Sequence, residues 1–143
     1  MLVGISPLLS PDLLSTLYRM GHGDEIVLAD AHFPGESINS HVVRADGLKI
    51  VPLLDAILPL FALDKSCENP LIMMAPSPGD SIDLQVEKSY LQTIKKMWAD
   101  TPEIFKIERY SFYDRAKKAF AVVMTGDTAT YANIILRKGV TPL

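Results

Sequence analysis

Five side chains in this sequence could exchange protons without the help of a cofactor. They are one imidazole, two carboxyl groups and two phenols: His22, Asp30, Asp64, Tyr113 and Tyr131. An imidazole takes up and releases a proton near neutral pH, so it can act as the acid in one direction of a reversible reaction and as the base in the other. The set therefore predicts acid and base chemistry on a small molecule, without identifying that molecule.

Each candidate also has a purely structural explanation. His22 stands between two glycines after a predicted helix, where an imidazole can simply face the negative end of that helix. Asp30 at a strand end can cap the next turn, and Tyr113 and Tyr131 fit core aromatics with satisfied hydroxyl groups. Arg109 fits a solvated charge, although a guanidinium can also hold sugar hydroxyls or a carboxylate.

The sequence lacks several motifs that would indicate other chemistry. It has no Walker loop, no G-x-S-x-G elbow and no second cysteine to pair with Cys67. We therefore expect no cofactor, and neither nucleotide-dependent nor redox chemistry. Asp30 and His32 could supply metal ligands, but no second ligand cluster follows at a recognisable spacing. We predict no metal site, and a metal-dependent hydrolase built on these two residues stays as an alternative.

Segments with apolar residues at helical spacing alternate along the chain with short, continuous apolar runs. These predicted helices and strands must position the candidate side chains. Ser10-Pro11-Asp12 begins a helix, and a left-handed glycine beside His22 is expected to end it. A buried strand over 25–29 then carries Asp30 at its C-terminal end. Further strands are expected over 41–44, 71–75, 104–108, 119–124 and 134–137, helices over 52–61, 83–98 and 112–118, and a loop over 31–40. Pro59 should kink or shorten the helix over 52–61.

This alternation predicts the α/β class. We expect a single three-layer α/β/α domain over residues 1–143, with a largely parallel or mixed central sheet. In such folds the functional groups lie on loops at the ends of strands. Asp30 is placed in that way by the strand before it.

Composition narrows the class of partner. The 143 residues include 14 Lys and Arg against 17 Asp and Glu, which gives a net charge of −3 without a continuous basic stripe, so we expect no nucleic acid partner. No basic leader and no apolar stretch of about 18 residues occurs, so we expect a cytoplasmic protein without a membrane partner. Hydrophobic residues make up 48% of the chain and the mean hydropathy is +0.18, which favours a homo-oligomer over a well-filled monomer.

Four segments resemble the ribose pyranase and fucose mutarotase family. They are MGHGDEIVLADAHFP over 20–34, RADG over 44–47, IERYSFYDRA over 107–116 and YANIILRKGV over 131–140. Arg109 and the pair Phe112-Tyr113 look like the fucose branch of the family rather than the ribose branch. Ala132 departs from the pattern, because the family commonly has glycine there, and the backbone is then less free to approach a substrate.

The resemblance implies roles for individual residues. His22 would be the proton donor, and Tyr113 would lie near the ring or anomeric oxygen of a sugar. The sugar hydroxyls would be held by the other members of the set, namely Asp30, Asp64, Arg109, Tyr131 and Asn133. It also implies a three-layer fold and a homo-oligomer, with a homodecamer as the expected assembly.

The implied activity is the interconversion of the α and β anomers of L-fucose by ring opening and closure, without metal or nucleotide. Two alternatives stay open within this resemblance. One is a ribose pyranase, which interconverts the pyranose and furanose forms of D-ribose by the same ring opening. The other is a non-catalytic sugar-binding accessory to transport.

Overall fold

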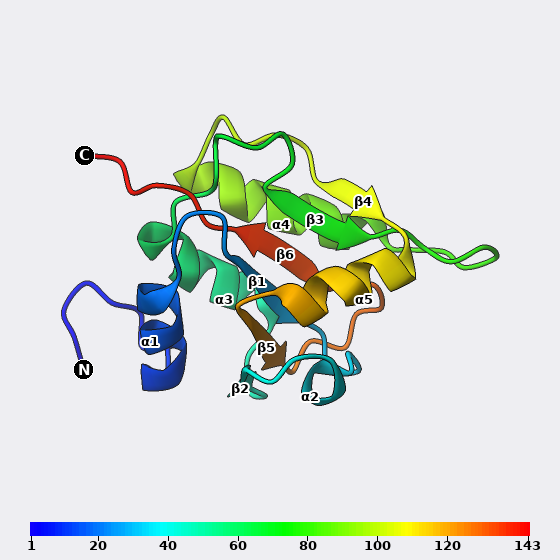
Figure 1. The fold of residues 1–143 in the computed structure, drawn as a ribbon, viewed down its shortest axis with the longest axis horizontal. Coiled ribbons are helices and arrows are strands. Elements are labelled where there is room, and N and C mark those ends of the chain that lie inside the picture. The colour runs from blue at the N-terminus through cyan, green and yellow to red at the C-terminus, as the bar shows by residue number, and fades with distance from the viewer.

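The computed structural model describes all of residues 1–143 and contains one six-stranded sheet (Figure 1). Across the sheet the strands run in the order β2 (Val42–Ala45), β5 (Ala121–Thr125), β1 (Glu25–Ala29), β6 (Ile134–Arg137), β3 (Leu71–Met74) and β4 (Phe105–Ile107). β6 is antiparallel to both of its neighbours, and every other neighbouring pair is parallel. The sheet is therefore mixed, as the sequence predicts.

The central pair β1 and β6 determines where the polar side chains lie. Because β6 runs against β1, Ile134 pairs with Leu28 while Arg137 pairs with Glu25. The residues that precede β6 therefore meet the residues that follow β1. The residues that follow β6 meet those that precede β1, at the opposite edge of the sheet.

Helices cover both faces of the sheet. On one face lie α1 (Pro11–Arg19), α3 (Ile50–Ile57) and α4 (Leu84–Met97), and on the other lie α2 (Gly35–Ile38) and α5 (Arg109–Lys118). Ile26 and Leu28 of β1 point into the first layer, and Val27 and Ala29 into the second. All four are fully buried, which is why this strand is a continuous apolar run rather than an alternating one. The predicted three-layer α/β arrangement is confirmed.

The strongest local signals in the sequence form the expected elements. The Ser10 hydroxyl accepts from the N–H of Leu13 at 3.1 Å and begins α1. Asp83 begins α4, the longest helix, by accepting from the N–H of Gln85. α3 ends at Ile57, and a 3-10 turn, Leu58–Leu60, continues around Pro59, which cannot donate the next helical hydrogen bond.

Three local predictions are wrong. α5 begins at Arg109, three residues before the predicted start at 112, because the Glu108 carboxylate accepts from the N–H groups of Tyr110 and Ser111. The predicted loop over 31–40 contains α2, which packs on α5 and β5. α1 ends at Arg19 with Met20 extended, so no left-handed glycine ends it.

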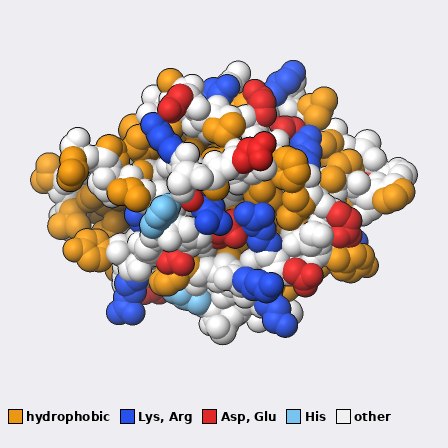
Figure 2. Space-filling view, turned by 45° about the horizontal axis from the view of Figure 1, so that its top comes forward, with side chains coloured by type: hydrophobic (Ala, Val, Ile, Leu, Met, Phe, Trp, Pro, Cys, Tyr) orange, Lys and Arg blue, Asp and Glu red, His pale blue; other side chains and the backbone are white.

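The outer surface mixes charges of both signs. Lys and Arg side chains are interspersed with Asp and Glu over the face drawn in Figure 2. Hydrophobic side chains gather at the end of the molecule where both termini lie (Figures 1 and 2). No helix combines the length and the apolar character that a membrane crossing requires.

Candidate active site

A cavity of about 240 Å³ opens where β1 ends, β6 begins and α5 starts, and we call it the strand-end pocket. Ten residues line it: Asp30, His32, Phe33, Pro34, Met74, Arg109, Tyr113, Thr130, Tyr131 and Asn133. Five of these belong to the set that the sequence singles out for sugar chemistry. The pocket lies at strand ends, where ligands of α/β sheets bind.

Asp30 and Asn133 form the floor of the strand-end pocket. Both are buried, with exposed fractions of 5% each, and the N–H of Asp30 donates to Oδ1 of Asn133 at 2.8 Å. The Asp30 carboxylate accepts from the N–H of His32 at 3.0 Å. Burial raises the pKa of this carboxyl group, and the backbone hydrogen bonds oppose that shift only in part. The remaining lone pairs of Asp30 and the amide N–H groups of Asn133 are free for a polar ligand.

Arg109 and Tyr113 form one wall of the strand-end pocket, one helical turn apart on α5. Nε of Arg109 donates to the Tyr113 hydroxyl at 3.2 Å, and the guanidinium carbon lies 5.4 Å from the Tyr113 ring centroid. Phe33 packs edge-on against Tyr113 at 5.6 Å and against Phe112 at 6.0 Å. These aromatic contacts hold the Tyr113 ring in place while Arg109 stays exposed, with donors left for a ligand.

Tyr131 has a strained backbone at the rim of the strand-end pocket. Its φ is 55°, the only positive value for a residue other than glycine in the chain. The next carbonyl, that of Ala132, accepts from the buried Tyr90 hydroxyl at 2.8 Å. Ala132 is fully buried, so this contact fixes the backbone between Tyr131 and Asn133. The methyl group in place of the family's glycine points into the core and takes no part in the pocket.

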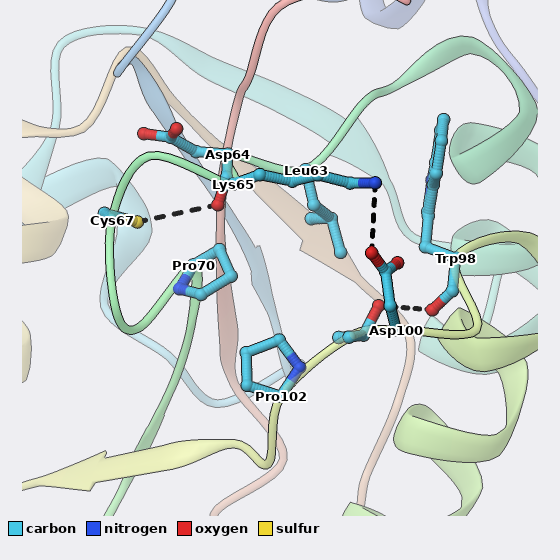
Figure 3. A pocket seen from close by; sticks show the side chains of 9 residues that line it. Leu63, Asp64, Lys65, Cys67, Pro70, Trp98, Asp100 and Pro102 are labelled. Carbon is cyan, nitrogen blue, oxygen red and sulfur yellow. Dashed lines mark hydrogen bonds and ion pairs between the residues drawn. The ribbon is translucent and has the colours of Figure 1, made fainter.

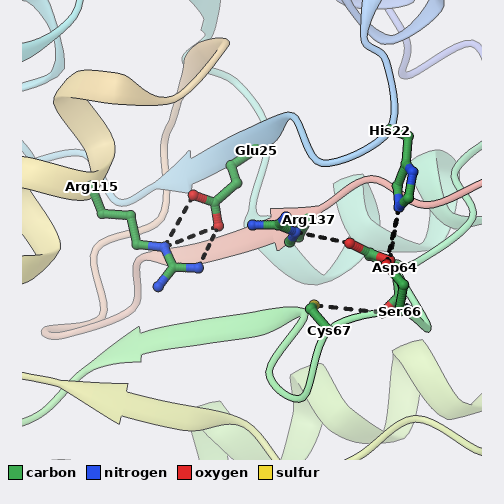
Figure 4. A network of polar contacts seen from close by, with 7 residues as sticks. All are labelled: His22, Glu25, Asp64, Ser66, Cys67, Arg115 and Arg137. Atoms are coloured by element: carbon green, nitrogen blue, oxygen red, sulfur yellow. Dashed lines mark hydrogen bonds and ion pairs between the residues drawn. The ribbon is translucent and has the colours of Figure 1, made fainter.

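A second group of polar side chains lies at the opposite edge of the sheet, and we call it the histidine cluster. Its members are His22, Asp64, Ser66 and Arg137 (Figure 4). Nε2 of His22 lies 3.2 Å from Asp64 Oδ1 and 3.2 Å from Ser66 Oγ. Nε of Arg137 donates to Asp64 Oδ2 at 2.8 Å.

The hydrogen bonds assign the tautomer of His22. Asp64 accepts from the hydroxyl and the N–H of Ser66 and from Arg137, and these bonds hold its pKa far below the ordinary range. A carboxylate only accepts, so the proton on neutral His22 belongs on Nε2. Nδ1 has no partner within the chain, and the imidazole is half exposed. His22 thus has one nitrogen oriented by Asp64 and one free to exchange protons.

Close packing against β6 positions Asp64. Its N–H donates to the Arg137 carbonyl at 3.0 Å, and the N–H of Gly139 donates to the Ala62 carbonyl at 2.7 Å. A Cβ at Gly139 would lie 2.5 Å from the Leu63 carbonyl oxygen, so only glycine permits this approach. The 63–66 loop therefore runs beside the end of β6, which brings Asp64 to Arg137.

Two cavities border the histidine cluster. One, of about 360 Å³, is lined by His22, Asp64, Ser66, Trp98 and residues near the C-terminus. The other, of about 270 Å³, is lined by residues of the 63–66 loop, where Lys65 pairs with Asp100 at 3.1 Å beside Trp98 (Figure 3). Neither cavity shares a lining residue with the strand-end pocket.

The predicted site residues therefore divide into two groups within one chain. Asp30, Arg109, Tyr113, Tyr131 and Asn133 line the strand-end pocket, whereas His22 and Asp64 lie in the histidine cluster. β1 separates the two groups, and its Cα atoms from Glu25 to Ala29 alone span ~13 Å.

Sequence reasoning missed several residues of the two groups, among them Phe33, Ser66 and Arg137, and it also missed Tyr90, which supports the backbone at Ala132. The pattern D-x-S at 64–66, in which a serine can satisfy the preceding carboxylate, is the one local signal that could have found Ser66. Asp30 and His32 are both in the strand-end pocket, but no group of three or more His, Cys, Asp or Glu side chains lies together in a way that could hold a metal ion.

Comparison with known proteins places this geometry in a family. The model of the RbsD / FucU transport protein family matches residues 3–141. An L-fucose mutarotase of Histophilus somni is 57% identical over 143 residues, which is 100% of this chain and 99% of the relative.

Solved structures agree with the sequence comparison. The fucose mutarotase of Streptococcus pneumoniae in complex with L-fucose superposes with a TM-score of 0.93 at 45% identity, covering 99% of this chain and 100% of that one. Bacillus subtilis RbsD complexed with D-ribose gives a TM-score of 0.72 at 23% identity, over 99% and 100% of the two chains. The second likeness concerns the fold alone.

Proposed function

The chain belongs to the RbsD / FucU transport protein family, and from that premise we propose that it is an L-fucose mutarotase, an isomerase that interconverts the α and β anomers of L-fucose. The observation that carries the proposal is the strand-end pocket. It gathers a carboxylate, an amide, a guanidinium and two phenols in about 240 Å³. That volume lies below the range of about 300–1,000 Å³ typical of drug-sized ligands and suits a monosaccharide.

The reaction needs acid and base chemistry and no redox step. A base removes the proton of the anomeric hydroxyl, an acid protonates the ring oxygen, and the C1 to ring oxygen bond breaks to give the open aldehyde. Rotation about the C1 to C2 bond and closure on the other face of the carbonyl give the second anomer. Because the reaction is its own reverse, a group that both takes up and releases protons serves in both directions.

The strand-end pocket supplies positioning. The buried Asp30 carboxylate can accept from two sugar hydroxyls, and Asn133 can donate its amide N–H groups beside it. Arg109 donates from the wall, and its bond to Tyr113 brings that phenol toward the same ligand. We assign these residues to sugar binding, with Tyr113 near the ring oxygen.

The histidine cluster supplies the proton exchange. Asp64 orients His22 through Nε2 and leaves Nδ1 free. Because β1 separates His22 from the strand-end pocket, we propose that a second copy of the chain brings its His22 and Asp64 to that pocket. The active protein is then a homo-oligomer in which each site takes residues from two copies.

Exposed apolar side chains support this assembly. Val140 is 70% exposed and borders the same cavity as His22, and the end of the chain near it carries the exposed Leu143. Met1 and Val3 are fully exposed near the N-terminus, which lies at the same end of the molecule as the C-terminus (Figure 1). Exposed apolar side chains such as Val140, beside the histidine cluster, fit a subunit contact. A decamer is the assembly we propose.

We place the enzyme in the cytoplasm. Its one thiol, on Cys67, is half-buried, and burial raises its pKa, so it stays a thiol rather than a reactive thiolate. A single unpaired cysteine is the usage typical of a reducing compartment.

Exchange NMR on L-fucose tests the proposal. With the protein present, saturation transfer between the α and β anomeric protons should speed up well beyond the spontaneous rate, and treatment with EDTA should leave that rate unchanged. D-ribose in the same assay distinguishes a ribose pyranase. Binding of L-fucose without faster exchange would contradict the proposal and favour a transport accessory.

A further inference from the structure

A tight turn follows β3 beside the strand-end pocket. In the segment Ser77-Pro78-Gly79-Asp80, the N–H of Asp80 donates to the Ser77 carbonyl at 2.9 Å, and Gly79 has a φ of +87°. Proline in the second position and positive φ in the third define a type II turn. Because proline presets one residue and glycine permits the other, this segment is preorganised in the sequence itself.

Both ends of the turn bind the same atom. The N–H of Ser77 donates to the Tyr131 hydroxyl oxygen at 3.2 Å, and that hydroxyl donates its proton to Oδ2 of Asp80. Tyr131 lies 51 and 54 residues away from these partners in the sequence. Its unusual backbone conformation, with φ at 55°, is therefore held in part by two bonds at the far end of the side chain.

These bonds determine what the Tyr131 hydroxyl can offer to a ligand. A phenol hydroxyl has one donor and two acceptor sites. Asp80 takes the donor and Ser77 fills one acceptor site, which leaves a single lone pair. Tyr131 lines the strand-end pocket, so that lone pair can accept a hydrogen bond from a ligand.

We propose that the 77–80 turn is a clamp that fixes the Tyr131 hydroxyl as an acceptor for one hydroxyl group of the sugar, which makes Asp80 and Ser77 positioning residues of this site. The inference rests on the proposed sugar-binding function and adds a direction to one contact. The Tyr131 hydroxyl oxygen accepts a hydrogen bond from the sugar and donates none to it. Tyr131 therefore contributes to sugar binding from the rim of the pocket. Asp30 contributes from the floor and Arg109 from the wall.

Variants of Asp80 test the clamp by their effect on KM. Asp80→Ala removes the acceptor and should raise KM for L-fucose about 3- to 10-fold, with kcat changed less than about twofold, as expected for one lost hydrogen bond. Asp80→Asn keeps an acceptor oxygen and should return KM to within about twofold of wild type. Asp83→Ala is the matched control, because Asp83 lies in the same loop but caps Gln85 and does not contact Tyr131.

A double mutant shows whether Asp80 acts through Tyr131. The KM of Asp80→Ala/Tyr131→Phe should match that of Tyr131→Phe within about twofold, because the second change removes the atom that the first one positions. The proposal would be overturned if the fold-increase in KM of the double mutant equalled the product of the fold-increases of the two single mutants. Wild-type KM in Asp80→Ala would overturn it as well.

Tyrosine NMR separates the clamp from the proposed activity. In protein labelled at Cζ of its five tyrosines, the Tyr131 signal is identified by its loss in Tyr131→Phe. That signal should shift in Asp80→Ala and stay in place in Asp83→Ala. An unmoved signal overturns the clamp even in an active enzyme, whereas wild-type protein that fails to exchange L-fucose anomers overturns the proposed function.

Discussion

The strand-end pocket and the histidine cluster place their carboxylates in opposite electrostatic surroundings. The pocket has a buried carboxylate whose pKa is raised by burial. The histidine cluster has a carboxylate whose pKa is lowered by Ser66, Arg137 and His22, and it presents a half-exposed imidazole. On the proposed function, one region holds the sugar and the other moves the proton. A single chain keeps the two functions at opposite ends of β1.

The largest effect is expected from removing His22, the group proposed to exchange protons with the sugar. His22→Ala should lower kcat about 10²- to 10⁴-fold, the usual contribution of a positioned acid or base, and leave KM within about twofold. Exchange NMR gives both constants, and circular dichroism with size-exclusion chromatography checks the fold and the assembly. A variant that exchanges L-fucose anomers at the wild-type rate would remove His22 from the reaction.

A smaller loss is expected from the strand-end pocket. Arg109→Ala removes charge-assisted hydrogen bonds worth about 1.5–3 kcal/mol, which is roughly one to two decades in kcat/KM. Lys117→Ala on the same helix is the matched control, because that exposed side chain is outside the pocket. If both variants keep wild-type kcat/KM, Arg109 is a solvated charge and the wall of the pocket has another function.

Mixed assemblies test whether the two regions meet across copies. His22→Ala and the double variant Asp30→Asn/Arg109→Ala should each be nearly inactive alone, since each lacks one half of every site. When they are co-expressed in equal amounts, about one quarter of the sites should combine an intact pocket with an intact histidine. Exchange NMR should then show about a quarter of the wild-type rate. Mixed protein no more active than its parents would place the whole site within one copy.

The last effect is expected on stability rather than on activity, and it concerns Asp64. Its pKa is lowered in the folded state, so its stabilisation is fully present above about pH 4 and is lost as the pH falls toward the folded value. Asp64→Asn should lower the free energy of unfolding at pH 7 by about 2 kcal/mol, less than for a fully buried pair because Arg137 is 35% exposed.

Urea unfolding at pH 7 and at pH 3 measures the effect of Asp64→Asn, and the loss should shrink at the lower pH. Asp55→Asn, at an exposed position on α3, should change the free energy of unfolding by less than about 0.5 kcal/mol at both values. An equal loss at pH 7 and pH 3 would mean that packing, and not ionisation, explains the role of Asp64.

Local signals in the sequence predict most of the fold. Strand β1 and strand β6 lie where their apolar runs predict them, and the Ser10 cap begins α1. α2 could not be predicted, because a helix of four residues has no stripe of its own and depends on contacts with α5 and β5. The start of α5 depends on the Glu108 side chain as a cap, a signal hidden by the strand pattern before it.

The candidate residues could be predicted, but their arrangement could not. His22 and Asp64 are 42 residues apart, and they meet only because the 63–66 loop runs beside the end of β6. The antiparallel direction of β6 sends Asn133 to one edge of the sheet and Arg137 to the other. Strand direction is a property of the whole topology and has no local signature in the residues of β6. For the same reason, the clamp on Tyr131 could not be found from the sequence of its turn alone.

The separation of His22 from Asp30 by β1 has a consequence for how catalysis responds to protein concentration. On the proposed division of the site, an isolated copy carries one pocket without a base and one base without a pocket. Specific activity then follows mass action among copies and falls on dilution below the dissociation constant of the contact, even while every copy stays folded. In an open chain of copies, each free end leaves an incomplete site. A closed ring has no free end, so every pocket meets a histidine from a neighbouring copy and each copy has one complete site.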